Sequence, residues 1–582
     1  FKKPHTEIEK CLAGIWSELL NLPQVGLDDD FFEVGGDSIL SIQLVSKMRQ
    51  SGLEITMEQV FEYPTLEKLA SVAKKIEGLP NTTVSMEQEI VEKEIVLSPI
   101  QQWFLEQPGN PWHHYNQAVL IKSAVPVEPE VLEKSLQALL ETHPNLGLRF
   151  KQTASGVWEQ QSVETSQLME YRFGICRVED LSSLESEAAL KKRLEVMEAV
   201  QQNLHITQGP LFQGVLFQGS AEGDYLFLVC HHLLIDSVSW RILLDDLELA
   251  YNQVTEGVPI KLAEERRRFG WWTSQLQDLA KTEPLQKELD YWEDKLRHSQ
   301  LKLPQDFPES GSNTMESLRE ITLELSVMET RQLLQGVPRA YHTQVNDVLL
   351  TALSLSLVDW LGSSELSLML EGHGREALTA EMDLSRTVGW FTSLYPIRID
   401  LTGVENIGDA LKRVKENLRS IPQKGIGYGM LKYFSQEGKN RLSLKEPEIS
   451  FNYLGQWNTQ NVQGKKRFDF TKGEVGSSIS PQYQRPRLLE INSQVIDEVL
   501  SIHLGYSKNH HQEKTIELIG SKILENLRSI IQHCCVEKQF GYTPSDFPLA
   551  KIPQETLDRV FGKIPNIEDI YPLSPMQEGL LF

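Results

Sequence analysis

Two hydrophobic periodicities divide the chain. Over the first part, apolar residues recur at intervals of three and four within 7–20, 38–49 and 66–76, which predicts three amphipathic helices. One face of the first helix carries Ile8, Leu12, Ile15, Trp16, Leu19 and Leu20. Residues 1–78 are therefore predicted to form a small helical bundle.

A polar stretch without periodicity, residues 79–94, is interpreted as a linker. Beyond it, short apolar runs that predict strands alternate with amphipathic helical patterns. The strands are expected at 225–230, 366–370 and 448–453, and the helices at 240–251 and 346–357. This alternation predicts a mixed α/β architecture over residues 95–537.

One short motif occurs twice. The sequence Leu-Ser-Pro-Ile-Gln at 97–101 returns as Leu-Ser-Pro-Met-Gln at 573–577. We interpret residues 538–582 as a linker followed by the start of a second domain of the same kind. Since the chain also lacks an initiator methionine, we expect it to be a fragment of a longer protein.

Composition narrows the function classes. The chain has 582 residues, 40% of them hydrophobic and 24% charged, which is typical of several folded domains. A formal net charge of -24 argues against nucleic acid as a ligand. No apolar run is long enough for a membrane span or signal peptide, so a cytoplasmic location is expected. Five scattered cysteines without a CxxC pair predict neither disulfides nor a zinc site.

Ser38 opens a predicted helix directly after Gly35-Gly36-Asp37. One interpretation is that Asp37 or Ser38 only caps the helix. The other is that Ser38 carries a phosphodiester, because unpaired N–H groups at a helix N-terminus favour anions. The Gly-Gly-Asp-Ser motif resembles the peptidyl carrier domains of nonribosomal peptide synthetases, which are small four-helix bundles. That resemblance implies 4′-phosphopantetheine on Ser38, beside Asp37, with the substrate held as a thioester.

A His-His-x-x-x-Asp motif follows the predicted strand at 225–230. His231, His232 and Asp236 would lie at a strand-to-helix turn, where histidine can act as a general base. Two other interpretations are a buried, hydrogen-bonded histidine pair and a metal site, and the motif offers no third metal ligand. Arg375 is expected to pair with Asp236, so that Asp236 braces the turn and His232 stays free.

The motif at the end of a strand resembles the condensation-domain superfamily. The implied fold is an α/β domain of two chloramphenicol acetyltransferase-like lobes around a tunnel, with the N-lobe at about 95–270 and the C-lobe at about 271–537. Ser237 stands where ordinary condensation domains usually have glycine, which is similar to the epimerisation branch. Further segments that resemble epimerisation motifs are 371–376, 388–392, 425–429 and 451–456.

Epimerisation removes the α-proton from one face of a thioester and returns a proton to the other, which favours one group on each side. The resemblance implies that His232 and Glu371 are catalytic, that Tyr453 supports them, and that His231, Asp236 and Arg375 are structural. His232, backbone N–H groups near Asp236 and the Tyr453 hydroxyl are candidates for stabilising the enolate oxygen. Which group deprotonates the L-form stays open.

Alternatives remain at this stage. A peptide-bond-forming condensation domain would use His232 without needing Glu371, and a noncatalytic platform would only order carriers. Taken alone, Glu371 could be a salt-bridge carboxylate and Tyr453 an ordinary strand residue. The expected partners are an upstream adenylation domain, a downstream condensation domain and an aminoacyl or peptidyl thioester. The identity of the amino acid is not readable from the sequence.

Overall fold

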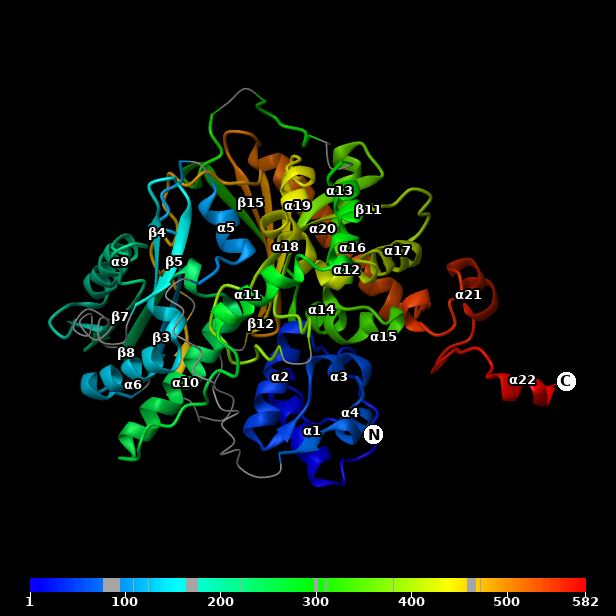
Figure 1. The fold of residues 1–582 in the computed structure, drawn as a ribbon, viewed down its shortest axis with the longest axis horizontal. Coiled ribbons are helices and arrows are strands. Elements are labelled where there is room, and N and C mark those ends of the chain that lie inside the picture. The colour runs from blue at the N-terminus through cyan, green and yellow to red at the C-terminus, as the bar shows by residue number, and fades with distance from the viewer. Residues whose placement is uncertain are drawn as a thin grey trace.

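The computed structural model describes most of the chain (Figure 1). The described residues are 1–76, 95–107, 109–123, 125–163, 176–220, 222–297, 302–308, 311–379, 382–457, 467–471 and 473–581. The linker predicted at 79–94 lies outside them. The N-terminal helical unit lies against the larger α/β part, and the C-terminal segment extends away from it.

Residues 1–76 fold around a core of their own. The helices are α1 (Glu7–Leu20), α2 (Ser38–Gln50), α3 (Met57–Glu62) and α4 (Leu66–Val72). Trp16, Phe31 and Leu44 are buried at its centre. The helix expected at 66–76 ends early, because Lys74–Lys75 forms strand β2, which pairs antiparallel with β1 (Leu53–Glu54).

The first half of the larger part contains a five-stranded sheet in the order β13-β3-β8-β7-β6. Its strands are β3 (Asn116–Ser123), β6 (Cys176–Asp180), β7 (Phe212–Gln218), β8 (Asp224–His231) and β13 (Phe468–Phe470). Helices α6 (Pro129–Thr142), α9 (Ser186–Gln202) and α10 (Ser237–Thr255) lie beside it (Figure 1). β8 is buried along its whole length, which explains its continuous apolar run.

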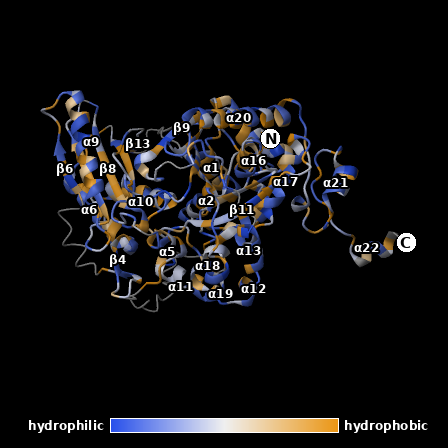
Figure 2. Cartoon of the chain, turned by 90° about the horizontal axis from the view of Figure 1, so that it is seen from above, coloured by the Kyte–Doolittle hydropathy of each residue, from blue (hydrophilic) through white to orange (hydrophobic). Residues whose placement is uncertain are grey.

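The second half contains a six-stranded sheet in the order β11-β10-β12-β14-β15-β9. Its strands are β9 (Leu318–Glu324), β10 (Glu365–Gly372), β11 (Ser393–Asp400), β12 (Ile449–Trp457), β14 (Leu489–Ile496) and β15 (Val499–Ser507). Helices α16 (Val345–Leu361) and α20 (Glu513–Ile531) pack on it and on each other. Apolar residues gather on the strands and on the inward helix faces (Figure 2).

The remaining elements connect and cover these sheets. They are α5 (Pro99–Leu105), β4 (Leu148–Gln152), β5 (Trp158–Ser162), α11 (Phe269–Leu279), α12 (Glu283–Gln286), α13 (Leu289–Arg297), α14 (Val327–Arg331), α15 (Val337–Tyr341), α17 (Ile407–Arg419), α18 (Ile426–Phe434), α19 (Gln436–Arg441), α21 (Gln554–Phe561) and α22 (Pro575–Leu581). α18 contains most of the glycine-rich segment 425–429, which is therefore helical rather than a loop.

The two sheets do not divide at residue 270, where the boundary between the lobes was expected. β13, from the second half of the chain, pairs antiparallel with β3 of the first sheet through Phe468–Ser123 and Phe470–Ile121. The strand covers what would otherwise be an open sheet edge. This long-range pairing has no local signal in the sequence.

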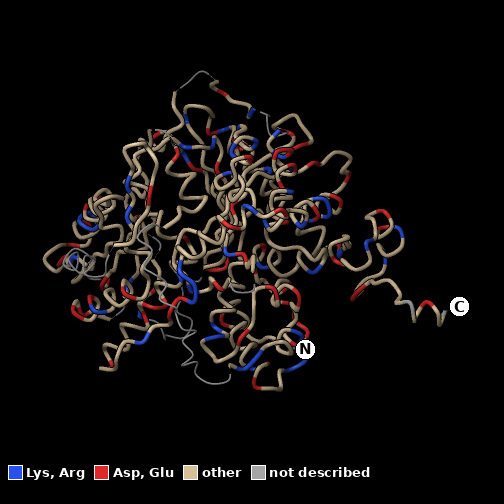
Figure 3. Tube along the Cα trace, viewed as in Figure 1, with Lys and Arg blue, Asp and Glu red and all other residues tan. Residues whose placement is uncertain are grey.

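The segment after α20 folds against the second half instead of forming only a linker. Tyr542, Phe547 and Leu557 form a small buried cluster. Lys415, itself buried, pairs with Asp546, which fastens the segment to α17. Acidic and basic residues alternate along the trace here and elsewhere (Figure 3). Among the described helices, none is both long and apolar enough to cross a membrane.

Candidate functional site

β8 ends at the His-His-x-x-x-Asp motif. His231 is its last residue, His232 begins a short 3₁₀ turn, and α10 starts after its N-cap, Asp236. The sequence folds this way because a buried apolar strand runs into a capped helix. Asp236 accepts a hydrogen bond from the Ser239 backbone N–H at 2.7 Å, which is ordinary N-cap geometry.

His231 is a fully buried structural histidine. Its Nε2–H donates to the Trp112 carbonyl oxygen at 2.7 Å, and its Nδ1 accepts from the Leu233 N–H at 3.2 Å. Burial lowers the pKa of His231 to about 3. The side chain therefore stays neutral near pH 7, and neither ring nitrogen is free for proton transfer.

His232 is held in one tautomer. Its Nδ1 lies 2.8 Å from the Ile235 carbonyl oxygen, which only accepts, so Nδ1 carries the proton and Nε2 keeps a lone pair. The ring stacks between Trp390 and Tyr115, with centroids 4.2 Å and 5.5 Å away. Burial lowers the pKa of His232, so the imidazole is a neutral base at pH 7.

Asp236 forms the expected ion pair with Arg375. Arg375 Nη2 lies 3.0 Å from Asp236 Oδ1, and both side chains are buried. Arg375 Nη1 also donates to the carbonyl oxygens of Leu384 and Thr387. Asp236 Oδ2 further accepts from the Phe391 N–H at 3.2 Å. The pair therefore braces the His232 turn against the segment that follows β10.

Glu371 lies near the end of β10, on the other sheet. Its Oε2 accepts a hydrogen bond from Asn452 Nδ2 at 2.8 Å. Burial raises the pKa of Glu371 to about 7, the charge of Glu490 adds to the rise, and Arg487 opposes it. Glu371 is thus divided between its protonated and charged forms near neutral pH, which suits a general acid or base.

The segment after Glu371 requires glycine. Gly374 has φ +67°, and a Cβ there would lie 1.7 Å from the Phe391 carbonyl oxygen. No other residue fits this close approach. The turn lets the chain reverse so that Arg375 reaches Asp236 while Glu371 stays on the strand.

Tyr115 connects the two groups. Its ring stacks on His232, and its pKa is raised well above the usual range by burial, then by Tyr483 and by the charge of Glu371. His232 and Glu371 therefore approach the same aromatic side chain from two different sheets. This arrangement can present a base on one side of a substrate and an acid on the other.

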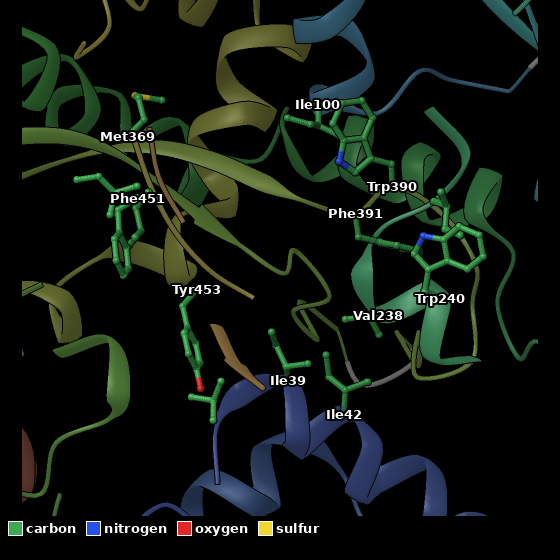
Figure 4. Close-up of a cluster of buried hydrophobic side chains, with 14 of the residues drawn as sticks. Ile39, Ile42, Ile100, Val238, Trp240, Met369, Trp390, Phe391, Phe451 and Tyr453 are labelled. Atoms are coloured by element: carbon green, nitrogen blue, oxygen red, sulfur yellow. The ribbon is translucent and has the colours of Figure 1, made fainter. Parts of the chain in front are cut away.

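The helical unit is docked beside this site. Ile39 and Ile42 of α2 are 8% and 3% exposed and belong to the core cluster of the larger part. Figure 4 shows both residues beneath Val238 and Tyr453. Gln456 Nε2 donates to the Gly35 carbonyl oxygen at 2.6 Å, and Arg49 pairs with Asp383.

Ser38 is the first residue of α2, and Asp37 caps that helix by accepting from the Leu40 N–H at 2.8 Å. Tyr453 points from β12 toward α2 (Figure 4). Burial and then the charge of Asp37 raise the pKa of Tyr453. Among the described residues, the buried Tyr453 Oη and Asp37 Oδ2 have no hydrogen-bond partner. Unsatisfied polar atoms beside Ser38 fit a polar group attached there.

Three side chains at the site were not expected from the sequence. Asn452, next to Tyr453, is the residue that contacts Glu371, and Gln117 Nε2 lies 3.0 Å from His232 Nε2. Trp390 was interpreted as ordinary core, but it stacks on His232. Asn452 lies within the motif at 451–456, whereas Gln117 had no signal of its own. A role for Tyr453 in proton transfer stays a prediction.

Two of the segments that resemble epimerisation motifs meet at one cavity of about 410 Å³. Phe391 and Thr392 line it from one segment, and Ile426, Tyr428 and Gly429 line it from the other. Within the part of the chain that the structure describes, no group of three or more His, Cys, Asp and Glu side chains could hold a metal ion.

Two family models match the chain. A condensation domain matches residues 91–551, and a phosphopantetheine attachment site matches residues 12–72. The second match covers α1 to α4 and includes Ser38. The first covers both sheets and the segment that packs against α17.

Relatives match along the whole chain. One of the large proteins of linear gramicidin synthase from Brevibacillus parabrevis is 42% identical over 100% of this chain, and surfactin synthase subunit 1 from Bacillus subtilis is 36% identical over 96%. The chain spans only 7% and 15% of those proteins. Among solved structures, the epimerization domain from the third module of tyrocidine synthetase B is 36% identical with a TM-score of 0.71, covering 78% of this chain and 99% of that domain.

Proposed function

The chain belongs to the condensation-domain family of nonribosomal peptide synthetases and contains a site for covalent 4′-phosphopantetheine, and from this premise we propose that it epimerises its substrate. The reaction is inversion at Cα of an aminoacyl or peptidyl group held as a thioester on Ser38. The observation that carries the proposal is the pair of His232 and Glu371. Their pKa values are displaced toward each other, and both contact the surroundings of Tyr115.

Ser38 is the proposed attachment residue. It begins α2 where that helix docks on the larger part, beside the unsatisfied Tyr453 hydroxyl. The arm supplies a thiol that holds the substrate as a thioester, which acidifies its α-proton. Tyr453 and the backbone N–H groups at the start of α2 are the residues that would hold the arm's polar groups.

His232 and Glu371 perform the two proton transfers. Neutral His232 accepts the α-proton at Nε2, and protonated Glu371 delivers a proton to the opposite face of Cα. In the reverse direction the charged Glu371 is the base and the His232 imidazolium is the acid. Aromatic rings on both faces of His232 exclude water and keep the proton within the pair.

The wider organisation is also a proposal. We assign residues 1–78 to the carrier, 79–94 to a linker, 95–537 to the epimerisation domain, and 538–582 to a linker with the start of a condensation domain. The epimerisation domain would have two lobes, each built on one sheet, with β13 crossing between them. An upstream adenylation domain and a downstream condensation domain are the proposed partners, because the relatives are synthase proteins far longer than this chain.

The test starts from both enantiomers. Ser38 is loaded with an L- or a D-aminoacyl pantetheine, the thioester is released after fixed times, and its chirality is determined. We expect the two reactions to converge on one L/D ratio, and Ser38→Ala to prevent loading. Unchanged chirality from both starting materials would contradict the proposal. Peptide-bond formation with an added acceptor aminoacyl thioester would favour a condensation domain instead.

A further inference from the structure

Gln117 is placed against the nitrogen that His232 would use as a base. It lies on β3 opposite Cys230 of β8, and its Nε2 is 3.0 Å from His232 Nε2. Because His232 Nδ1 holds its proton against the Ile235 carbonyl oxygen, Nε2 can only accept. The Gln117 amide therefore turns its NH₂ group, not its oxygen, toward His232.

The rest of this amide is unused. Gln117 Oε1 is buried and has no hydrogen-bond partner among the described residues. The NH₂ group has two N–H bonds, and His232 accepts only one of them. A buried amide with an unsatisfied oxygen costs free energy, and such groups in native proteins are often functional. The amide is thus positioned beside the reacting nitrogen with hydrogen-bonding capacity to spare.

Resting on the proposed function, we propose that Gln117 is a catalytic residue that donates a hydrogen bond to the thioester carbonyl oxygen and to the enolate formed from it. Proton transfer to His232 Nε2 requires Cα to lie within about 3–3.5 Å of that nitrogen. The carbonyl oxygen is two bonds from Cα. An amide 3.0 Å from His232 Nε2 is therefore within hydrogen-bond reach of that oxygen.

The proton and charge balance supports this role. When His232 Nε2 takes the α-proton, the C–H electron pair moves onto the carbonyl oxygen and gives an enolate. Nε2 then no longer accepts, so the Gln117 N–H that it had bound is released for the enolate oxygen. When Glu371 returns a proton to Cα, the charge leaves the oxygen. Donors placed at such a developing charge give large rate effects.

The test uses the complete phosphopantetheinylated chain loaded with an L-aminoacyl thioester in D₂O. Gln117→Met removes both N–H donors at similar volume, and we expect deuterium incorporation at Cα to fall about 10²-fold. Gln117→Glu keeps the size and shape of the side chain but places a negative charge beside the enolate, so it should lose at least as much. Gln202→Met, at an exposed position on α9, should change nothing.

A second measurement separates enolate stabilisation from tuning of His232. NMR titration of His232 in the unloaded protein gives its pKa, and Gln117→Met should raise it, because a donor to the neutral ring is lost. Deuterium incorporation is therefore compared at pH 8, where His232 is neutral in both proteins. A persistent 10²-fold deficit supports the proposal.

Two results overturn it: equal incorporation by wild type and Gln117→Met, or a deficit that disappears entirely once His232 is deprotonated. If both Gln117 variants unfold, the amide is required for folding and the proposal also falls. Failure of the proposed function is distinguishable, because then the wild-type chain itself incorporates no deuterium.

Discussion

The His232 side and the Glu371 side of the site have opposite chemistry under the same physical influence. Burial disfavours the charged form of each group, so it lowers the pKa of the histidine and raises the pKa of the carboxyl group to about 7. In water a histidine would release its proton at higher pH than a carboxylic acid. Here the two affinities are brought together, so that one proton can reside on either group.

The two sides also differ in rigidity. His232 is fixed by the Ile235 carbonyl oxygen and two aromatic rings, and Asp236 and Arg375 brace its turn. For Glu371 the structure gives one hydrogen bond, from Asn452. We infer that the carboxyl group adapts to the substrate while the imidazole stays in place. Substitutions on the two sides should therefore disturb the pair to different extents.

Removing either titrating group should abolish inversion. His232→Gln and Glu371→Gln are each expected to lower the rate of L/D interconversion about 10³-fold, because each eliminates one of two obligatory proton transfers. Chiral analysis of the released thioester measures the effect. Glu525→Gln, on the exposed face of α20, is the matched control. A Glu371→Gln protein with normal inversion would remove the carboxyl side from the mechanism.

Breaking the ion pair should affect the fold as well as the His232 side. Arg375→Met leaves the Asp236 carboxylate buried without its cation, which costs about 3–5 kcal/mol. Urea unfolding followed by tryptophan fluorescence should show this loss. Asp236→Asn combined with Arg375→Met should be less destabilised than Arg375→Met alone. Unchanged stability of Arg375→Met would mean that the pair does not brace the turn.

The pH dependence should identify the one-proton state of the pair. Glu371, with a pKa of about 7, loses its proton as the pH rises above 7, while His232 gains one only below its lowered pKa. The inversion rate should therefore pass through a maximum and fall about fivefold from pH 7 to pH 8. Initial rates in this range test it. A rate that rises steadily to pH 9 would contradict a protonated Glu371.

Asn452→Ala should produce the smallest effect. Its N–H stabilises the charged form of Glu371, so its removal should raise the pKa of that carboxyl group by roughly half a unit to one unit. The alkaline limb of the pH–rate profile should move upward by that amount. Ser493→Ala, whose hydroxyl contacts only the Asn452 backbone oxygen, is the control. A downward shift would show that Asn452 does not stabilise the carboxylate.

Local patterns in the sequence predicted the strands and turns that carry the site. The apolar run at 225–230 lies within β8, and the ion pair between Asp236 and Arg375 was expected because an arginine follows Glu371. The expected bundle at 1–78 corresponds to a unit with its own core, although β2 replaces the end of its last predicted helix. These features depend on periodicity and capping, which are written locally.

Features that depend on long-range pairing could not be predicted in this way. The addition of β13 to the first sheet and the contact of Gln117 with His232 join residues more than 100 positions apart. The position of Asn452 beside Glu371 depends on the parallel register of β10 and β12. Tyr453 follows from the same register, which leaves its side chain pointing toward α2 instead (Figure 4).

The most direct test of the two-sided account is exchange in D₂O by the single variants. Each is loaded separately with the L- and the D-thioester, and deuterium and chirality are measured together. We expect His232→Gln and Glu371→Gln to exchange opposite enantiomers without inverting them, because each keeps the base for one face only. Exchange of the same enantiomer by both variants, or inversion by either, would contradict the claim that the two groups act from opposite faces.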